Sequence, residues 1–119
     1  MKYYTITTVF YMLFIAYLSH IPHDDLPTKS LSIENIDLLF HFVEYSVLGF
    51  LLFQSLYVDK LLTISPLRGS ILIGILFALS DEYHQSFVPG RHMSLTDMIF
   101  DSLGIIFGSS LVFRISNSS

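Results

Sequence analysis

Four long apolar runs, separated by short polar segments, dominate the hydropathy pattern of the chain. Each run is close to the roughly 20 residues that a helix needs to cross a hydrocarbon core about 30 Å thick. The connections between the runs contain proline, glycine and charged residues, which end helices and form turns. The pattern therefore predicts four transmembrane helices, at about residues 3–18, 36–57, 67–87 and 95–113.

The composition agrees with a membrane location. Of the 119 residues, 52% are hydrophobic and 13% are charged, whereas a soluble domain has roughly 25% charged residues. The length fits one domain and no repeat or linker divides it, so we expect a single all-α domain over residues 1–119, an integral membrane bundle. The net charge of -4 argues against a nucleic-acid partner, because no basic patch can neutralise a series of phosphates.

Lysine and arginine are distributed unequally between the two ends of the predicted helices. Of the six, four fall on the cytoplasmic side if the N-terminus is placed there: Lys2, Lys60, Arg68 and Arg114. Because cytoplasmic loops carry an excess of Lys and Arg, we expect both termini in the cytoplasm. All acidic residues except Asp59, and all histidines, then belong to outer loops or outer helix ends.

Ionisable residues are concentrated around the connection between the third and fourth runs, where Asp81 and Glu82 precede Arg91 and Asp97. Ionisable groups at membrane depth are costly and mark functional sites by default. Asp81 and Glu82 also fall at a helix C-terminus, where the helix dipole disfavours acids. An acid pair sharing a proton, an ion pair with Arg91, or a divalent cation bound by Asp81, Glu82 and Asp97 would each explain this placement.

Helical spacing arranges polar and small residues in stripes on three predicted helices. In the second helix, Asp37, His41 and Tyr45 recur every four residues and lead to Gly49. The third helix has Ser70, Gly74, Ala78 and Glu82 in one stripe with Asp81 and Gln85 beside it, and the fourth has Asp97, Asp101, Gly104 and Gly108. Small residues allow helix backbones to approach closely, so we expect the glycines to pack the helices together while the polar ends converge outside.

Two spaced motifs run through these stripes. The first reads Asp37-x-x-x-His41-Phe42-x-x-Tyr45-x-x-Leu48-Gly49, and the second reads Asp81-Glu82-x-His84-Gln85-x-Phe87-Val88-Pro89-Gly90-Arg91-x-x-Ser94-x-x-Asp97. Together they resemble the signature of VanZ-like membrane proteins, and the likeness covers nearly the whole chain. The chain departs from that family at two positions: Leu38 stands where a lysine is frequent, and Asp101 stands where an asparagine is common.

The resemblance implies a multi-pass protein of the bacterial cytoplasmic membrane. The family is named for an accessory protein of glycopeptide resistance that is associated with reduced susceptibility to teicoplanin. VanZ-like proteins have also been proposed to be distantly similar to membrane enzymes that exchange or remove lipid head groups. The acid at position 101 makes this site more negative than the family pattern, so we transfer no family role to Asp101.

The candidate site combines residue types that suit chemistry on a phosphate group. His41 can act as a base or nucleophile near neutral pH, and Arg91 can clamp a phosphate through paired hydrogen bonds. Glu82 is expected to relay protons, with Asp81 and Asp97 positioning these groups or a divalent cation. The residues expected to contact substrate or to orient the others are Tyr45, Gln85, Asp37 and Ser94.

Two functions fit these residues. The first is an enzyme at the outer membrane face, a hydrolase or transferase acting on a phosphate-bearing lipid head group or a lipid-linked envelope intermediate. The second is a non-catalytic membrane module that binds a lipid, a glycopeptide-related ligand or a partner protein. Both require His41, Glu82, Arg91 and Asp97 to lie near one another in an outward-facing cavity, because side chains on separate surfaces could not form a single site.

Overall fold

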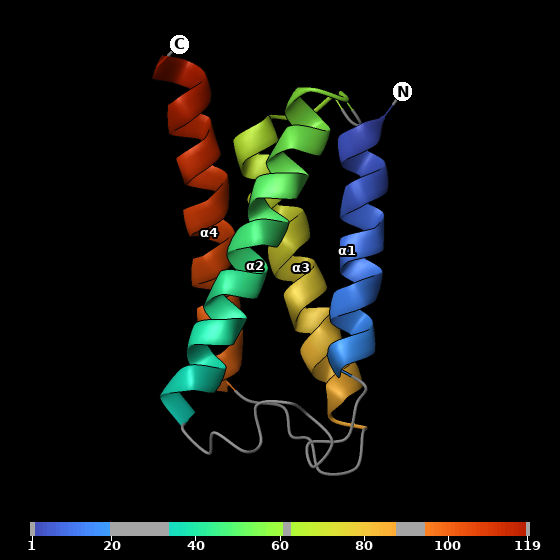
Figure 1. Cartoon of the computed structure of the whole chain (residues 1–119), viewed down its shortest axis with the longest axis vertical. Coiled ribbons are helices and arrows are strands. Elements are labelled where there is room, and N and C mark those ends of the chain that lie inside the picture. The colour runs from blue at the N-terminus through green and yellow to red at the C-terminus, as the bar shows by residue number, and fades with distance from the viewer. Residues whose placement is uncertain (1, 20–33, 61–62, 88–94, 119) are drawn as a thin grey trace.

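The computed structural model describes residues 2–19, 34–60, 63–87 and 95–118. Within these residues the chain forms four α-helices, which run alternately up and down as one bundle (Figure 1). They are α1 (Tyr3–Ser19), α2 (Glu34–Tyr57), α3 (Pro66–Gln85) and α4 (Leu95–Ser118). Both termini therefore lie at the same end of the bundle (Figure 1), and the prediction of an all-α chain with four helices is confirmed.

The helix ends differ from the predicted bounds by a few residues. α4 continues past residue 113 to Ser118, and α3 stops at Gln85 rather than at residue 87. Hydropathy locates the apolar part of a helix, whereas helical hydrogen bonding continues through polar residues until a cap ends it. α3 begins with Pro66 in its first turn, and the Ser65 hydroxyl accepts a hydrogen bond from the Arg68 N–H, an arrangement that suits a helix start.

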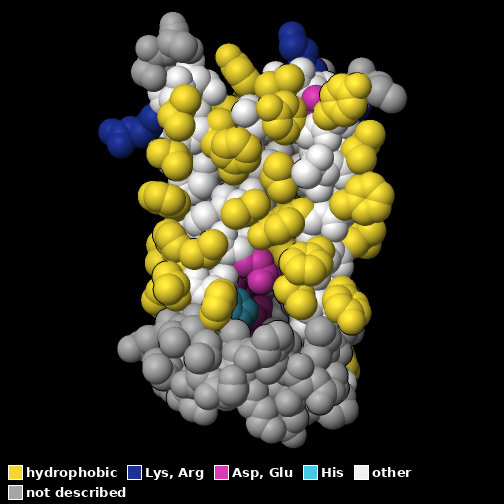
Figure 2. Space-filling model, in the orientation of Figure 1, with side chains coloured by type: hydrophobic (Ala, Val, Ile, Leu, Met, Phe, Trp, Pro, Cys, Tyr) yellow, Lys and Arg dark blue, Asp and Glu magenta, His cyan; other side chains and the backbone are white. Residues whose placement is uncertain are grey.

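Two helices are long and apolar enough to cross a membrane. The segments that meet this condition are Leu38–Tyr57 in α2 and Leu95–Ser116 in α4, while Tyr3–Leu18 is a shorter apolar helix. Large apolar side chains are spread over the face of the bundle that Figure 2 shows. Those more than half exposed include Phe10, Phe14, Leu72, Leu76 and Phe107, a distribution suited to contact with lipid. The chain thus has two or more candidate spans, and crossing by α1 and α3 stays a prediction.

Glycines bring α2 and α4 into close backbone contact. A Cβ atom added to Gly49 would lie 2.5 Å from a carbonyl oxygen of α4. A Cβ atom on Gly104 would overlap the carbonyl oxygen of Phe42, and one on Gly108 would overlap the carbonyl oxygen of Ser46. No larger residue fits at these points without moving a helix, so the glycines fix the position of α4 along α2.

Hydroxyl groups connect α3 to this pair of helices in the middle of the bundle. The buried Ser70 hydroxyl of α3 donates to Ser109 Oγ of α4 over 2.9 Å, and Ser109 in turn donates to the carbonyl oxygen of Gly49 over 3.2 Å. One turn beyond Ser70, a Cβ atom on Gly74 would lie 2.5 Å from Ile105 Cδ1. The three helices that carry the polar stripes are therefore held together in the middle of the bundle, away from their polar ends.

Candidate functional site

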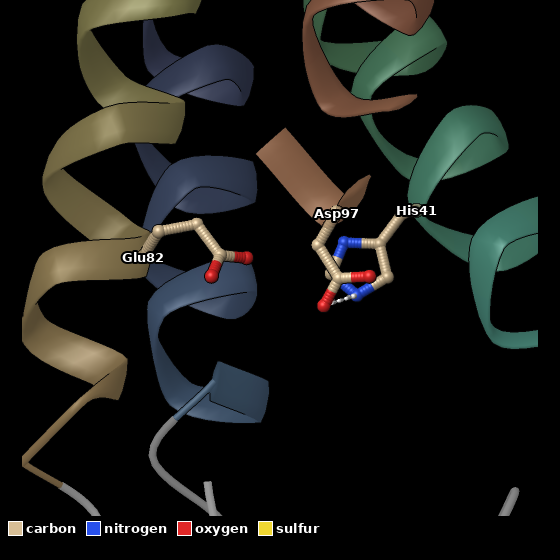
Figure 3. A group of neighbouring side chains, drawn as sticks. All are labelled: His41, Glu82 and Asp97. Carbon is tan, nitrogen blue, oxygen red and sulfur yellow. Dashed lines mark ion pairs between the residues drawn. The ribbon is translucent and has the colours of Figure 1, made fainter. Parts of the chain in front are cut away.

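A cluster of acidic residues and one histidine lies near the end of the bundle opposite the termini. His41 comes from the first half of α2, Glu82 from the last turn of α3, and Asp97 from the first turn of α4 (Figure 3). Because α3 runs opposite to α2 and α4, its last turn meets their first turns. Figure 2 shows acidic and histidine side chains between apolar ones at this level of the bundle.

A short hydrogen bond orients His41. Its Nδ1 lies 2.7 Å from Asp101 Oδ1, and Asp101 is 1% exposed. An ionised carboxylate can only accept hydrogen bonds, so with Asp101 ionised the Nδ1–H of His41 is the donor and a neutral imidazole carries its lone pair on Nε2. That nitrogen lies 3.8 Å from Asp97 Oδ2, so the free lone pair faces the other carboxylates of the cluster.

A second hydrogen bond connects α2 to α3 beside this histidine. The hydroxyl of Tyr45, one turn after His41, donates to Asp81 Oδ2 over 3.2 Å. Tyr45 is fully buried, and its ring packs on Phe77 with the ring centroids 6.3 Å apart. Tyr45 therefore holds the Asp81 carboxylate against α2.

The polar residues of α3 are buried among the other helices. Glu82 is 1% exposed, and Gln85 and Asp81 are also buried. Carboxylates are costly to remove from water and are retained where hydrogen bonds, ion pairs or a bound cation compensate them. Their burial distinguishes this end of α3 from an ordinary solvated helix end.

Three side chains place potential metal ligands close together. One donor atom from each of His41, Glu82 and Asp97 lies within 4.8 Å of the other two, and the Glu82 carboxylate is directed toward the other two side chains in Figure 3. The sequence hypothesis named Asp81, Glu82 and Asp97 for a cation. The group in the structure includes His41 in place of Asp81, whose carboxylate accepts the Tyr45 hydrogen bond instead.

Three of the residues named from the sequence fall where side chains are not described. Arg91 and Ser94 lie outside the described residues, and Asp37 belongs to α2 but its side chain lies outside them as well. The phosphate clamp assigned to Arg91 therefore stays a prediction. His84 is exposed and packs on the ring of Tyr83.

Asp101 is the residue that sequence reasoning set aside and the structure brings into the site. The sequence placed it on the same stripe as Asp97 but gave it no role, because it departs from the family pattern. The spacing of four residues from Asp97 was the available signal. In the structure Asp101 is the buried partner that fixes the His41 ring.

The charges of the bundle are separated between its two ends. In the described part of the chain, lysine and arginine occur only at the end that carries the termini (Figure 2). They are Lys2, Lys60, Arg68 and Arg114. The described residues of the acidic cluster thus have no lysine or arginine among their described neighbours, and the cluster contributes negative charge to its end of the bundle.

The four-helix bundle, its apolar surface and its buried acid–histidine cluster define an α-helical membrane protein with a polar site near one end. The chain belongs to the VanZ/LLP1 family, whose sequence profile matches residues 5–116. That match covers nearly all of the bundle and confirms the resemblance seen in the two motifs. Neither a search of curated proteins nor a search of solved structures gave a match.

Proposed function

We propose that this VanZ-like protein acts at the extracytoplasmic face of the bacterial cytoplasmic membrane on phosphate-bearing lipid head groups or lipid-linked envelope intermediates. The observation that carries the proposal is the 2.7 Å hydrogen bond between His41 and Asp101. It directs the Nε2 lone pair of a partly buried imidazole toward Asp97, and the Glu82 carboxylate lies close by (Figure 3). A histidine oriented in this way by a carboxylate is a recurrent arrangement in sites that transfer protons or bind metal ions.

The charge distribution supports an extracytoplasmic position. The four basic residues of the described chain gather at the end with the termini, and an excess of Lys and Arg favours the cytoplasmic side. The acidic cluster at the opposite end then faces outward. It also lies at the depth of lipid head groups, because His41 is three residues inside the apolar segment Leu38–Tyr57, about 4.5 Å along a helix that rises about 1.5 Å per residue.

The site contains the groups that a displacement at phosphorus needs. As a free imidazole, His41 takes the proton of an attacking hydroxyl while the new P–O bond forms, and Asp101 stabilises the resulting imidazolium. When protonated, the buried Glu82 gives a proton to the oxygen that leaves as the second P–O bond breaks. Arg91 is proposed to hold the phosphate, as its residue type suggests.

An apolar groove beside the cluster supports a lipid as the ligand. Its volume is about 450 Å³, and its lining residues are Leu38, Leu39, Phe42 and Phe100. Phe42 follows His41 in the sequence and Phe100 precedes Asp101, so the groove lies at the same level of the bundle as the cluster, on a neighbouring face of α2 and α4. The same groove would serve a second function, in which the protein binds a lipid, a glycopeptide-related ligand or a partner protein without changing it.

Reconstitution of the purified protein in vesicles of defined phospholipids tests the enzymatic proposal. We expect wild type to change the head groups, as measured by mass spectrometry of the extracted lipids, and His41→Ala to leave them unchanged. His84→Ala is the matched control, because His84 is an exposed histidine of α3. Identical head-group profiles for wild type and His41→Ala would contradict the proposal.

The non-catalytic alternative makes a different prediction for a conservative change. Glu82→Gln keeps the shape of the side chain and removes its acid, so a binding module would retain both its ligand and its phenotype. Teicoplanin susceptibility of cells producing each variant is the phenotype that the family likeness suggests for measurement. Retained lipid binding with lost phenotype in Glu82→Gln would favour the enzyme.

A further inference from the structure

We propose that His41, Glu82 and Asp97 bind a divalent transition-metal ion such as Zn²⁺ or Mn²⁺. The three residues come from α2, α3 and α4, and their nearest donor atoms lie within 4.8 Å of one another (Figure 3). Residues distant in sequence thus present one nitrogen and two carboxylate groups to a common point. Metal binding itself is independent of the proposed function, and only the use of the ion rests on that function.

The hydrogen bond to Asp101 prepares His41 as a metal ligand. A histidine that binds a metal through one ring nitrogen usually donates its other N–H to a carboxylate, which fixes the tautomer and raises the basicity of the ligand. The 2.7 Å bond between Nδ1 and Asp101 leaves Nε2, which lies 3.8 Å from Asp97 Oδ2, as the nitrogen available to a metal ion. Asp101 is therefore a positioning residue of the site.

Charge also favours a cation at this point. In the described part of the chain, the carboxylates of Asp81, Glu82, Asp97 and Asp101 lie at this end of the helices, and all but that of Asp97 are buried. Two positive charges would offset part of the cost of placing these acids at membrane depth.

The donor set selects the kind of metal. One imidazole nitrogen with two carboxylates is a ligand set typical of Zn²⁺, and the two carboxylates also suit Mn²⁺, whereas Ca²⁺ and Mg²⁺ are usually bound by oxygen ligands alone. Bonds of about 2.0–2.2 Å place tetrahedral ligands roughly 3.4 Å apart, so the widest pair must approach by about 1.4 Å. Rotation of the Glu82 side chain, with three rotatable bonds, can supply this movement.

A bound ion would deepen the proposed function. Three protein ligands leave a coordination position open, as in catalytic rather than structural metal sites. A water or a phosphate oxygen of the lipid head group fits that position, and a metal ion makes bound water more acidic and polarises a bound phosphate. If a metal ion is bound, His41 would donate its Nε2 lone pair to the ion and could not accept a proton there. His41 would therefore act as a base only in the metal-free protein.

Metal content of the purified full-length chain tests the site. The protein, carrying an affinity tag without histidine, is stripped with a chelator in detergent and dialysed against Zn²⁺ or Mn²⁺. Inductively coupled plasma mass spectrometry then gives the metal bound per chain as a function of free metal. We expect wild type to saturate with a single ion and to gain thermal stability as the ion binds.

Three variants distinguish the site from adventitious binding. Asp97→Asn replaces an anionic ligand, whose side chain is 25% exposed, by a neutral amide that is a poor metal ligand, so we expect the fold to be retained and saturable binding to be lost. Asp101→Asn keeps an oxygen that accepts from His41 but removes the charge, and we expect the affinity to fall by about 10- to 100-fold. Asp59→Asn, at the opposite end of the bundle, keeps wild-type affinity.

The possible results separate the two proposals. Absence of saturable binding in wild type, or equal binding by wild type and Asp97→Asn, overturns the metal site. Head-group turnover by the stripped protein together with absent binding overturns the metal site and leaves the proposed function standing. Saturable binding that Asp97→Asn abolishes, without any head-group change, supports the metal site and contradicts the proposed function.

Discussion

The two ends of the bundle hold their acidic residues in different ways. At the end with the termini, Asp59 is partly exposed and accepts hydrogen bonds from the Thr5 N–H over 2.8 Å and from the Thr5 hydroxyl over 2.9 Å. Because Thr5 gives its only hydroxyl proton to Asp59, Ser55 donates to Thr5 Oγ1 over 2.6 Å. At the other end Asp101 is almost fully buried and accepts from a histidine.

The two acids differ in the groups with which they form hydrogen bonds. Thr5 belongs to the first turn of α1, where backbone N–H groups have no partner within the helix and the helix dipole favours an acid. Asp59 completes that turn and so has a structural purpose. Asp101 lies in the second turn of α4, where the backbone N–H groups already have hydrogen-bond partners within the helix. Its carboxylate orients the imidazole of His41 and caps no helix end. The group with which a buried or partly buried acid pairs therefore indicates whether that acid is structural or functional. The presence of the acid alone does not.

Gly104→Ala should have the largest effect on stability, because it lies where the backbones of α2 and α4 are in contact, between the acidic end and the middle of the bundle. The new Cβ atom would overlap the carbonyl oxygen of Phe42, which the backbone cannot easily move. We expect the free energy of unfolding to fall by about 2–3 kcal/mol, measured by thermal or chemical denaturation in detergent. The displaced helix would also separate His41 from Asp101, so metal binding should weaken.

Gly69→Ala is the matched change toward the other end of the bundle. There a Cβ atom would meet Ile64 Cδ1 at 2.6 Å and Leu56 Cδ1 at 2.7 Å, which are the ends of flexible side chains. The alanine also gains up to about 1 kcal/mol of helix propensity, so the net change should be within about 1 kcal/mol. Equal destabilisation by the two substitutions would show that backbone contact does not distinguish the two ends.

Asp101→Ala should have the next largest effect. It removes the acceptor of the His41 Nδ1–H in the bundle interior, and an unsatisfied buried donor costs about 2 kcal/mol. Asp101→Asn restores an acceptor of the same shape and should recover most of this loss in the same unfolding measurement. If Asp101→Ala is as stable as wild type, Asp101 does not hold the ring as the distance indicates.

The sequence predicted the helices and their buried faces because both depend on local properties. Apolar runs locate the helices, and the helical repeat places Tyr45 and Gly49 on one buried face of α2. The pairing across helices depends on how far one helix is shifted along another. The contacts of Gly104 and Gly108 with α2 set that shift, and they place Asp101 rather than Asp97 at hydrogen-bonding distance from Nδ1.

Neighbouring acids of α3 show the same limit of sequence reasoning. Successive residues of a helix point about 100° apart, so Asp81 and Glu82 could not both face one partner. The sequence hypotheses placed Glu82 beside His41 and Asp97, but they also kept Asp81 among the possible ligands of a cation. In the structure Glu82 joins His41 and Asp97, while Asp81 accepts from Tyr45.

Tyr45→Phe tests the part of the acidic end that lies outside the metal group. It removes the hydroxyl that donates to Asp81 while keeping the ring that packs on Phe77. We expect a loss of about 1 kcal/mol in the free energy of unfolding and unchanged metal affinity. Tyr57→Phe, at an exposed position near the other end, is the control and should change neither quantity. A loss of metal binding in Tyr45→Phe would place Asp81 among the ligands after all.

Asp59→Asn should have the smallest effect and gives the sharpest contrast between the ends. Asparagine keeps an oxygen that can accept from Thr5, so only the favourable interaction of the charge with the start of α1 is lost, about 0.5 kcal/mol. Added salt screens this interaction in wild type, so the difference between wild type and variant should shrink as the salt concentration rises. Metal binding should not change, whereas Asp97→Asn should lose the ion at little cost to the stability of the metal-free protein. If Asp59→Asn lowered metal affinity as strongly as Asp97→Asn, the ion would not be bound specifically at the acidic end, and the distinction between a structural and a functional acid would fail.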